Sequence, residues 1–197
     1  MKRFLAGIIL CAIGLVHADV ESALKEANID KDIKITAPNE KIEVKYGDKA
    51  VELGNEFAPT ITKDVPEVHY KHEGGVLYTL ALTDPDIPMK GYYREWKHWL
   101  VGNIPEDKVG KGEVLAEYVG PAPPNGTGTH RYIFLLYKQN QGAITFTERR
   151  LSARDKARKF SITKFAQSYN LEGPIAANFF TAKYDDYVPI IHKQISL

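Results

Sequence analysis

Cysteine is almost missing from this sequence, since Cys11 is its one cysteine among 197 residues. Cys11 lies in an N-terminal segment that we expect to be removed, so the mature protein would have no thiol for a disulfide, a metal or nucleophilic catalysis. The remaining chain of roughly 180 residues is long enough for one domain to bury about 70% of its unfolded surface. The sequence therefore predicts a fold that depends on its hydrophobic core.

An excess of charge of one sign is also missing. The chain has 26 basic and 25 acidic residues, and loss of Lys2 and Arg3 would leave 24 against 25, a formal charge of −1. A protein that coats nucleic acid needs surplus cationic side chains to release counterions, so we do not expect nucleic acid as a partner. The densest basic stretch, Arg149 to Lys159, also contains Asp155, and we interpret it as a solvated helix face.

Long apolar runs are lacking beyond the first residues. Two basic residues precede the apolar stretch Phe4 to Val16, and a cleavage site with small residues ends at Ala18. This pattern predicts a signal peptide over residues 1–18 and a secreted protein in which residues 19–197 form a single domain. Charged residues interrupt every later apolar run within about ten residues, which is too short for a membrane-spanning helix.

Short strands dominate the pattern of the remaining chain. Apolar and polar side chains alternate in segments bounded by Gly, Pro or Asp, whereas three segments show helical spacing. The predicted strands are 32–36, 41–46, 65–70, 77–82, 98–104, 114–118, 131–137, 143–146 and 177–184, and the predicted helices are 20–28, 153–169 and 186–195. Many short strands with few helices favour an all-β dominated fold, a β-sandwich of Greek-key type with a few peripheral helices, including a C-terminal one.

Three of these strands are predicted to bring polar side chains to one edge of a sheet. Because side chains alternate along a strand, Asp84 ends an apolar face, and His98 and His130 each begin one. The residues assigned to the same faces are Tyr78, Leu80 and Leu82, then Trp96 and Leu100, then Tyr132, Phe134 and Leu136. If the first two strands are antiparallel neighbours and 114–118 returns the chain once more, the carboxylate and both imidazoles meet at one mouth. Prolines and glycines in the connecting loops would shape that mouth before a ligand arrives.

The side chains at this mouth have the chemistry of an anion site. A carboxylate biases a neighbouring imidazole toward its cationic form, and Asp84 or Asp86 would act in this way on His98. A cationic histidine and the phenol of Tyr132 or Tyr93 then donate to phosphate oxygens, each charge-assisted bond contributing about 1.5–3 kcal/mol. The alternative is structural: the histidines would lie at the edge of the core, and the aspartates would form turns before proline.

Three segments, Asp84 to Pro88, Tyr93 to Trp99 and Gly126 to Tyr132, resemble the phosphatidylethanolamine-binding protein family. The resemblance is close over residues 77–137 and loose over most of the mature chain, and Tyr187-Val188-Pro189 also matches. It implies a β-sandwich that binds phosphate-bearing small ligands, such as phosphoethanolamine headgroups. The ligand-binding residues that it implies are Asp84, Asp86, Pro88, Tyr93, Trp96, His98, Pro123, Pro124, His130 and Tyr132, with His192 at a pocket-side position.

The chain also departs from the family pattern. Lys97 stands where many members have a second histidine, and His192 stands where tyrosine is common, so we expect a more cationic entrance. Pro121-Ala122 replaces a more usual Ser-Gly.

Several members are described as protease inhibitors or kinase regulators. An extracellular protein-interaction role, such as serine-protease inhibition or signalling modulation, is therefore the alternative function.

Catalysis is the least favoured function. Asp84, His98 and His130 could form a facial metal set for the hydrolysis of phosphate esters. However, the sequence has no HxH or HExxH spacing and no Gly-x-Ser-x-Gly elbow. We therefore expect a monomeric binding protein that is not an enzyme and has no cofactor or resident metal. A chemosensory carrier is disfavoured because a polar mouth would suit apolar odorants poorly.

Two local features complete the expectations for the loops. Asn125-Gly126-Thr127 is an acceptor sequence for N-glycosylation in a chain destined for secretion. Ile87–Pro88 is a candidate for a cis peptide bond, although an X-Pro sequence alone gives this a low frequency.

Overall fold

Two β-sheets and four short α-helices make up the described part of the computed structural model, residues 19–88 and 94–196. The strands are β1 (Glu40–Lys41), β2 (Glu43–Tyr46), β3 (Lys49–Ala50), β4 (Glu67–His69), β5 (Leu77–Asp84), β6 (Glu95–Pro105), β7 (Glu113–Ala116), β8 (His130–Gln139), β9 (Lys159–Phe160) and β10 (Glu172–Ala182). The helices are α1 (Val20–Glu26), α2 (Ile29–Asp32), α3 (Ile162–Ser168) and α4 (Val188–Ser196), with a 3₁₀ turn η1 (Val109–Lys111).

The larger sheet has the strand order β1-β10-β8-β5-β6-β7, and β9 pairs with β6 outside this path. The smaller sheet has the order β3-β2-β4. Strand neighbours are antiparallel except for β1 and β10, which run parallel. The predicted all-β dominated fold with a few peripheral helices is therefore confirmed.

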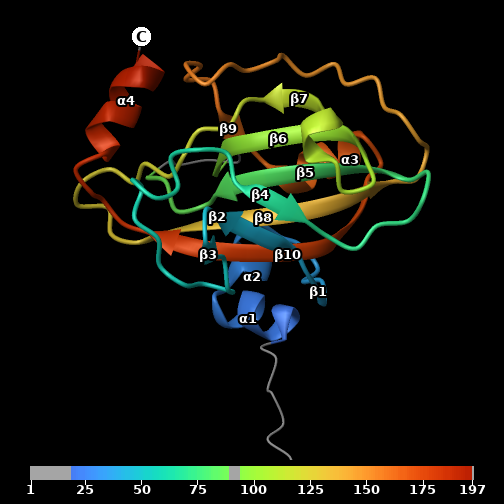
Figure 1. The fold of residues 1–197 in the computed structure, drawn as a ribbon, viewed down its shortest axis with the longest axis horizontal. Coiled ribbons are helices and arrows are strands. Elements are labelled where there is room, and N and C mark those ends of the chain that lie inside the picture. The colour runs from blue at the N-terminus through green and yellow to red at the C-terminus, as the bar shows by residue number, and fades with distance from the viewer. Residues whose placement is uncertain (1–18, 89–93, 197) are drawn as a thin grey trace, which may run out of the picture.

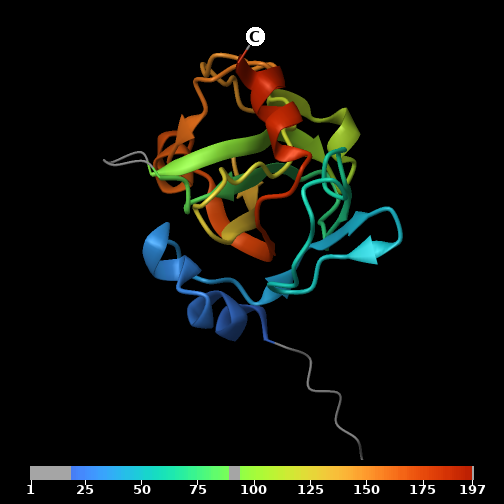
Figure 2. The same ribbon diagram turned by 90° about the vertical axis from the view of Figure 1, so that its left-hand side faces the viewer.

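Side chains cover both faces of the larger sheet. On one face, Leu80 and Leu82 of β5 belong to an apolar cluster with Val44 of β2 and Val68 of β4. On the other face, Ala81 belongs to a second cluster with apolar residues of α1, α2 and α3. Figure 1 shows the smaller sheet in front of the larger one, and Figure 2 shows α1 and α2 on the side opposite the β2–β3 hairpin. Because both faces are covered, β5 and β8 are buried along nearly their whole length.

Most predicted elements are confirmed with shifted ends. The predicted strands at 77–82, 98–104, 114–118 and 131–137 lie within or overlap β5, β6, β7 and β8, and 177–184 overlaps β10. The predicted helices 20–28 and 186–195 correspond to α1 and α4. No helix in the described parts of the chain is long and apolar enough to cross a membrane. The predicted signal peptide, residues 1–18, and the site candidate Tyr93 lie outside the described residues.

Two predicted strands are wrong. Residues 32–36 leave α2 through Lys34, which has a left-handed backbone with φ of 58°, so they do not extend as a strand. Residues 143–146 also pair with no strand, because the Asn103 side chain takes the place of one. Asn103 Nδ2 donates to the Ile144 carbonyl, and Asn103 Oδ1 accepts from the Ile144 N–H.

The predicted helix 153–169 is wrong in its first half, since α3 begins only at Ile162. The basic stretch before it is not a solvated helix face either. Its backbone wraps around Arg158, whose side chain is fully buried and donates to the carbonyls of Asp155, Lys97 and Glu117 and, at a short distance, Ser152. A guanidinium that binds several carbonyls replaces the regular hydrogen bonds of a helix here.

Candidate functional site

A pocket of about 370 Å³ opens where the end of β5, the start of β8, the start of β6 and α4 meet. It is large enough for a small organic ligand. Its lining combines a few polar side chains with a mainly apolar wall. The lining residues are Asp84, Ile87, Pro88, Trp96, His98, Ala122, Pro124, Tyr132, His192 and Ile195.

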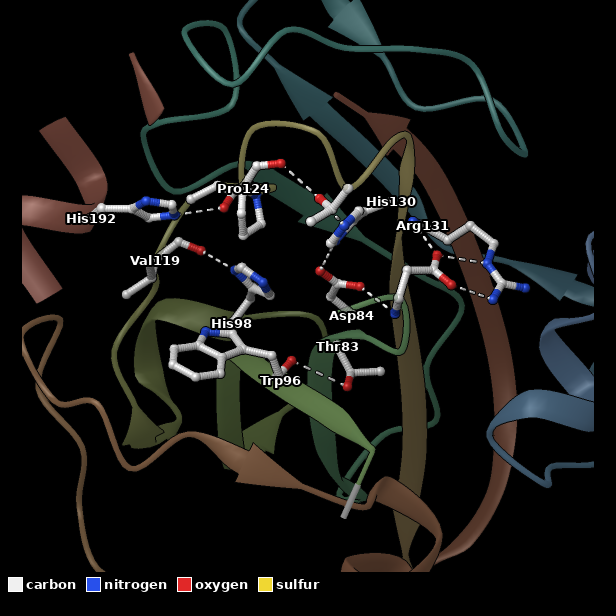
Figure 3. Close-up of polar contacts among 12 residues, drawn as sticks. Thr83, Asp84, Trp96, His98, Val119, Pro124, His130, Arg131 and His192 are labelled. Atoms are coloured by element: carbon white, nitrogen blue, oxygen red, sulfur yellow. Dashed lines mark hydrogen bonds and ion pairs between the residues drawn. The ribbon is translucent and has the colours of Figure 1, made fainter. Parts of the chain in front are cut away.

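The strand order explains why distant residues meet at this pocket. β5 lies between β6 and β8 and runs antiparallel to both, so its last residue, Asp84, lies beside the first residues of β6 and β8. Asp84 is paired in register with Trp96, and Thr83 with Ile133. The predicted meeting of Asp84, His98 and His130 at one edge is thus observed, although β8 reaches this edge beside β5 and β10 rather than beside β7 (Figure 3).

A β-bulge in β6 lies at the pocket residue His98. Leu82 pairs with Trp99 and Thr83 pairs with Lys97, so His98 has no partner in β5. Both His98 and Trp99 therefore face the cluster of Leu82, as is expected for two consecutive residues of a bulge. The prediction that Leu100 shares the face of His98 is wrong, because Leu100 belongs to the cluster on the opposite face.

Lys97 lies before the bulge and faces away from the pocket, because side chains alternate regularly from Trp96 through Lys97 to His98. Lys97 Nζ lies 4.6 Å from the centroid of the Phe160 ring, and the side chain is almost fully buried. Burial lowers the pKa of the Lys97 ammonium, a negative charge on Glu148 opposes this change, and the charge on Arg158 adds to it. The prediction that Lys97 makes the entrance more cationic is therefore wrong.

Asp84 and His130 form a buried ion pair beneath the pocket. His130 Nδ1 donates to Asp84 Oδ2 at 2.8 Å, and both side chains are almost fully buried. His130 Nε2 lies 2.8 Å from the Thr127 hydroxyl, which itself donates to the Pro124 carbonyl at 2.7 Å (Figure 3). Because the one hydroxyl proton of Thr127 is used, Nε2 must also donate, and both nitrogens of His130 carry protons. The expected carboxylate-stabilised imidazolium is therefore His130.

His98 has the opposite protonation from the one that we predicted. Its Nδ1 donates to the Val119 carbonyl at 2.8 Å, which fixes the proton on that nitrogen. Burial lowers the pKa of His98 to about 4, and the nearby Asp84 carboxylate only partly opposes this effect. At neutral pH the ring is uncharged, and its Nε2 has a lone pair, not a proton. The predicted cationic His98 is thus wrong.

The hydroxyl of Tyr132, a residue that lines the pocket, is a buried polar group. Its ring stacks on Phe180 with centroids 5.3 Å apart and meets the His98 ring edge to face at 5.1 Å. The Ala122 backbone N–H approaches the Tyr132 oxygen, but no hydrogen bond of normal geometry reaches this oxygen from the described residues. Burial raises the pKa of the phenol well above its ordinary value, so it remains a donor.

Asp86 faces away from the pocket and binds Arg131. Arg131 donates from Nε and Nη2 to the two oxygens of Asp86 at 2.9 and 2.6 Å, and its backbone N–H adds a third bond at 2.8 Å. Nη2 also reaches Asp32 of α2. Burial disfavours the charge on Asp86, but the bonds and charge of Arg131 outweigh it and lower the pKa of this carboxyl. Asp86 therefore fixes the loop 84–88.

The other predicted site residues divide into two groups. Pro88, Trp96, Pro124 and His192 line the pocket, whereas Pro123 is buried beside it and does not. His192 Nε2 donates to the Ala122 carbonyl at 2.9 Å and so ties α4 to the loop before β8. Sequence reasoning did not select the apolar lining residues Ile87, Ala122 and Ile195 as ligand contacts. Of these three residues, only Ile195 could have been identified from the sequence, because it belongs to the apolar face of the predicted C-terminal helix.

Two further expectations concern metal and backbone geometry. In residues 19–88 and 94–196, no cluster of three His, Cys, Asp or Glu side chains has the spacing of a metal site. The cis peptide bond among these residues is Gly173–Pro174 and not Ile87–Pro88. Asn125 lies on an exposed turn beside the pocket residue Pro124.

The sequence of this chain is similar to those of known proteins. The family model described as phosphatidylethanolamine-binding protein matches residues 32–180. A Drosophila melanogaster protein named "Putative odorant-binding protein A5" is 34% identical over 182 residues, covering 90% of this chain and 86% of the relative.

Solved structures share the fold. The solution structure of CG7054 is 40% identical, with a TM-score of 0.67 over 83% of this chain and 97% of that chain. A carboxypeptidase Y inhibitor, solved in complex with its cognate proteinase, is 25% identical, with a TM-score of 0.69 over 87% of this chain and 98% of the other. A Plasmodium falciparum phosphatidylethanolamine-binding protein, 23% identical, has a TM-score of 0.62 over 82% of this chain and 96% of that chain.

Proposed function

Because the chain belongs to the phosphatidylethanolamine-binding protein family, we propose that it binds small phosphate-bearing molecules in the pocket at Asp84, His98 and Tyr132. The observation that carries this proposal is the unpartnered hydroxyl of Tyr132. A buried hydroxyl without an acceptor loses hydrogen-bond energy, which a phosphate oxygen in the pocket would restore. The pocket volume of about 370 Å³ suits a headgroup-sized ligand such as phosphoethanolamine.

The apolar wall of the pocket adds a requirement to the ligand. Ile87, Pro88, Trp96, Pro124 and Ile195 present mainly hydrocarbon surface. The expectation of a polar mouth is therefore wrong, and with it the argument against apolar ligands. An organic phosphate, with one polar group and a carbon chain, would use both parts of this lining.

The same wall favours a second candidate function, the transport of small, largely apolar molecules. The Drosophila relative is named as a putative odorant-binding protein. Ligands of this class would fill the pocket through the Trp96 ring and the two isoleucines without any phosphate. Binding of a small aliphatic alcohol, with no binding of any phosphate, would favour this function over the first.

Isothermal titration calorimetry tests the phosphate proposal. We expect saturable heat from phosphoethanolamine and weaker heat from inorganic phosphate, which lacks an apolar part. Ala122→Phe should abolish binding because the added ring would occupy the pocket. Ile190→Phe, at an exposed position of α4 that does not line the pocket, is the control and should bind normally. Absence of heat from both ligands, with the protein folded, would reject the proposal.

We expect no catalysis at this site, and the hydrogen bonds give a reason. Asp84, His130 and Thr127 form a chain that is similar in order to a nucleophile activated by a histidine. However, the Thr127 hydroxyl donates to the Pro124 carbonyl, and His130 Nε2 donates to the hydroxyl oxygen. His130 has no free lone pair with which to accept the hydroxyl proton, so the chain does not activate Thr127.

Inhibition of a protease is the alternative function. One similar structure is a carboxypeptidase Y inhibitor in complex with its proteinase. A monomeric protein of this fold could act in the same way without use of the pocket. The distinguishing assay measures inhibition of carboxypeptidase Y and of a panel of serine proteases, with Ala122→Phe as the pocket-blocked control. Equal inhibition by both forms would assign this role to the surface outside the pocket.

We also propose that the protein is secreted after cleavage behind Ala18 and that Asn125 is glycosylated. Asn125 is exposed, which leaves room for a glycan at the rim of the pocket. Mass spectrometry of the protein from the medium of expressing cells tests both statements. We expect a chain that begins at Asp19 and a mass that falls after glycosidase treatment. An unshifted peptide that contains Asn125 would reject the glycan, and an intact N-terminus would reject the cleavage.

A further inference from the structure

The side chains that line the pocket offer hydrogen-bond acceptors as well as donors. His98 Nδ1 is committed to the Val119 carbonyl, so Nε2, which has no partner among the described residues, offers a lone pair. The Asp84 carboxylate is a second acceptor at the pocket floor. The donor groups of the lining are the Tyr132 hydroxyl and the indole N–H of Trp96. A ligand that uses both kinds of group therefore has to donate a hydrogen bond as well as accept one.

The pocket also provides little positive charge for an anion. None of its described lining residues is a lysine or an arginine. The nearby Arg131 is bound to Asp86 and Asp32, and Arg158 is bound to the backbone carbonyls of Lys97 and Glu117. The charge of His130 is balanced by Asp84. A doubly charged phosphate would enter this apolar space without a matching cation, which has a large desolvation cost.

We propose that the pocket selects phosphate monoesters in their singly charged form, with the remaining P–OH proton donated to His98 Nε2 and a phosphate oxygen bound by the Tyr132 hydroxyl. This inference rests on the proposed function and specifies the ligand further. A phosphodiester, the form of phosphate in an intact phospholipid, has the same single charge but no P–OH proton. The site therefore distinguishes free monoesters from the headgroups of a membrane.

The surroundings of His98 keep Nε2 an acceptor over the relevant pH range. Burial lowers the pKa of His98 to about 4, Asp84 opposes this, and the positive charges of Arg158 and His130 add to it. Tyr132 of β8 and His192 of α4 are the other titratable groups at the pocket. The hydrogen bond of His98 also leaves Nε2 without a proton, because the Val119 carbonyl holds the proton on Nδ1. His98 thus stays neutral at about pH 5, where a monoester with a second pKa near 6 still has its proton.

Two isomeric ligands test this inference with the unmodified protein. Ethyl phosphate and dimethyl phosphate have the same atoms, and at about pH 5 both have one negative charge, but only ethyl phosphate has a P–OH proton. Neither has an ammonium group that could replace that proton. At about pH 5 we expect ethyl phosphate to bind about tenfold more tightly, the effect of one hydrogen bond to a charged group. At about pH 8 only about 1% of ethyl phosphate keeps its P–OH proton, so its affinity should fall by up to about a hundredfold, while that of dimethyl phosphate stays the same.

The outcomes separate this inference from the function on which it rests. Binding of neither isomer at either pH would reject phosphate binding as a whole. Equal affinities at the lower pH, or tighter binding of ethyl phosphate at the higher pH, would overturn the selection of the P–OH group and leave phosphate binding in place.

Two variants assign the effect to the two side chains. Tyr132→Phe removes the donor that both isomers use, so both should weaken while the ratio of their affinities is unchanged. His98→Phe keeps an aromatic ring against Tyr132 but removes the acceptor, so the ratio should fall toward one. A ratio that persists in folded His98→Phe would show that another group accepts the proton. If that variant does not fold, the comparison of isomers and the Tyr132→Phe control still decide the inference.

Discussion

Asp84 and His130 are 46 residues apart in the chain, and their side chains meet at 2.8 Å beneath the pocket. A second pair in the same protein, His69 and Asp107, has almost the same geometry, with 2.9 Å between Nδ1 and Oδ2. The first pair is buried, whereas the exposed fractions of the second pair are 63% and 29%. The same His–Asp interaction thus occurs twice in this protein, once buried and once exposed to water.

Asp84→Asn should lower the free energy of unfolding by about 3–5 kcal/mol, because it leaves the His130 cation buried without its partner. Asp107→Asn should lower it by less than about 1 kcal/mol, since water screens the exposed pair. Urea denaturation of both variants measures the two losses. Similar losses would mean that burial does not determine the contribution of the pair.

Arg131→Lys should weaken ligand binding although Arg131 does not line the pocket. A lysine cannot bind both oxygens of Asp86, so the loop 84–88 that supplies Asp84 and Pro88 would be held less firmly. We expect the affinity for phosphoethanolamine to fall about tenfold, the equivalent of one charge-assisted bond. Hydrogen exchange at the Ile87 amide should increase in parallel.

Asp32→Asn is the control for this prediction, because it removes only the outer partner of Arg131 and leaves Asp86 bound. It should change the affinity little. Faster exchange in the loop of Arg131→Lys with an unchanged affinity would show that the position of the loop does not limit binding.

Glu95→Gln should stabilise the protein at neutral pH and not at acidic pH. Burial raises the pKa of Glu95 to about 7, although bonds from Thr83 and from the Ile162 N–H favour the charged form. Between the ordinary pKa of 4.5 and about 7, the folded protein binds this proton and the unfolded chain does not, so stability falls as pH rises. Glutamine removes this loss, with a gain of up to about 3 kcal/mol above pH 7.

The measurement for Glu95 is the difference in unfolding free energy between variant and native protein as a function of pH. A difference is needed because His98 acts in the opposite direction: its lowered pKa makes stability fall as pH drops from 6.5 toward about 4. Glu43→Gln, at an exposed position of β2, controls for the loss of one carboxylate. A pH-independent difference for Glu95→Gln would contradict the raised pKa.

Arg158→Met should destabilise the fold by at least about 3 kcal/mol, because the buried carbonyls of Lys97 and Glu117 lose their donor. Arg154→Met, at an exposed position of the same segment, should change stability by less than about 0.5 kcal/mol. Thermal unfolding compares the two variants. Equal small effects would restore the interpretation of this segment as a solvated surface.

The meeting of Asp84 and His130 could be predicted from the sequence, because it depends only on alternation along two strands and on an even number of chain reversals. The face of His98 was also predicted correctly from its alternation with Trp96, but the same rule failed for Leu100. The face of Leu100 depends on the bulge after His98, and this bulge depends on how Leu82 and Thr83 pair across the sheet, which no local pattern in β6 specifies.

The charge of the two histidines could not be predicted, because each depends on atoms from distant loops. The Val119 carbonyl fixes the proton of His98, and the Thr127 hydroxyl fixes that of His130. The burial of Arg158 could not be predicted for the same reason. An arginine in a run of basic residues normally lies in water, and only the carbonyls that surround it in the folded protein explain its burial.

The bonds that close the pocket span long stretches of chain, 46 residues between Asp84 and His130 and 70 residues between Ala122 and His192. Loop-closure entropy delays such distant contacts until the strands have paired. During refolding, the ability to retain a ligand should therefore return after the circular dichroism of the sheet. A bound ligand should slow unfolding and leave the rate of folding almost unchanged.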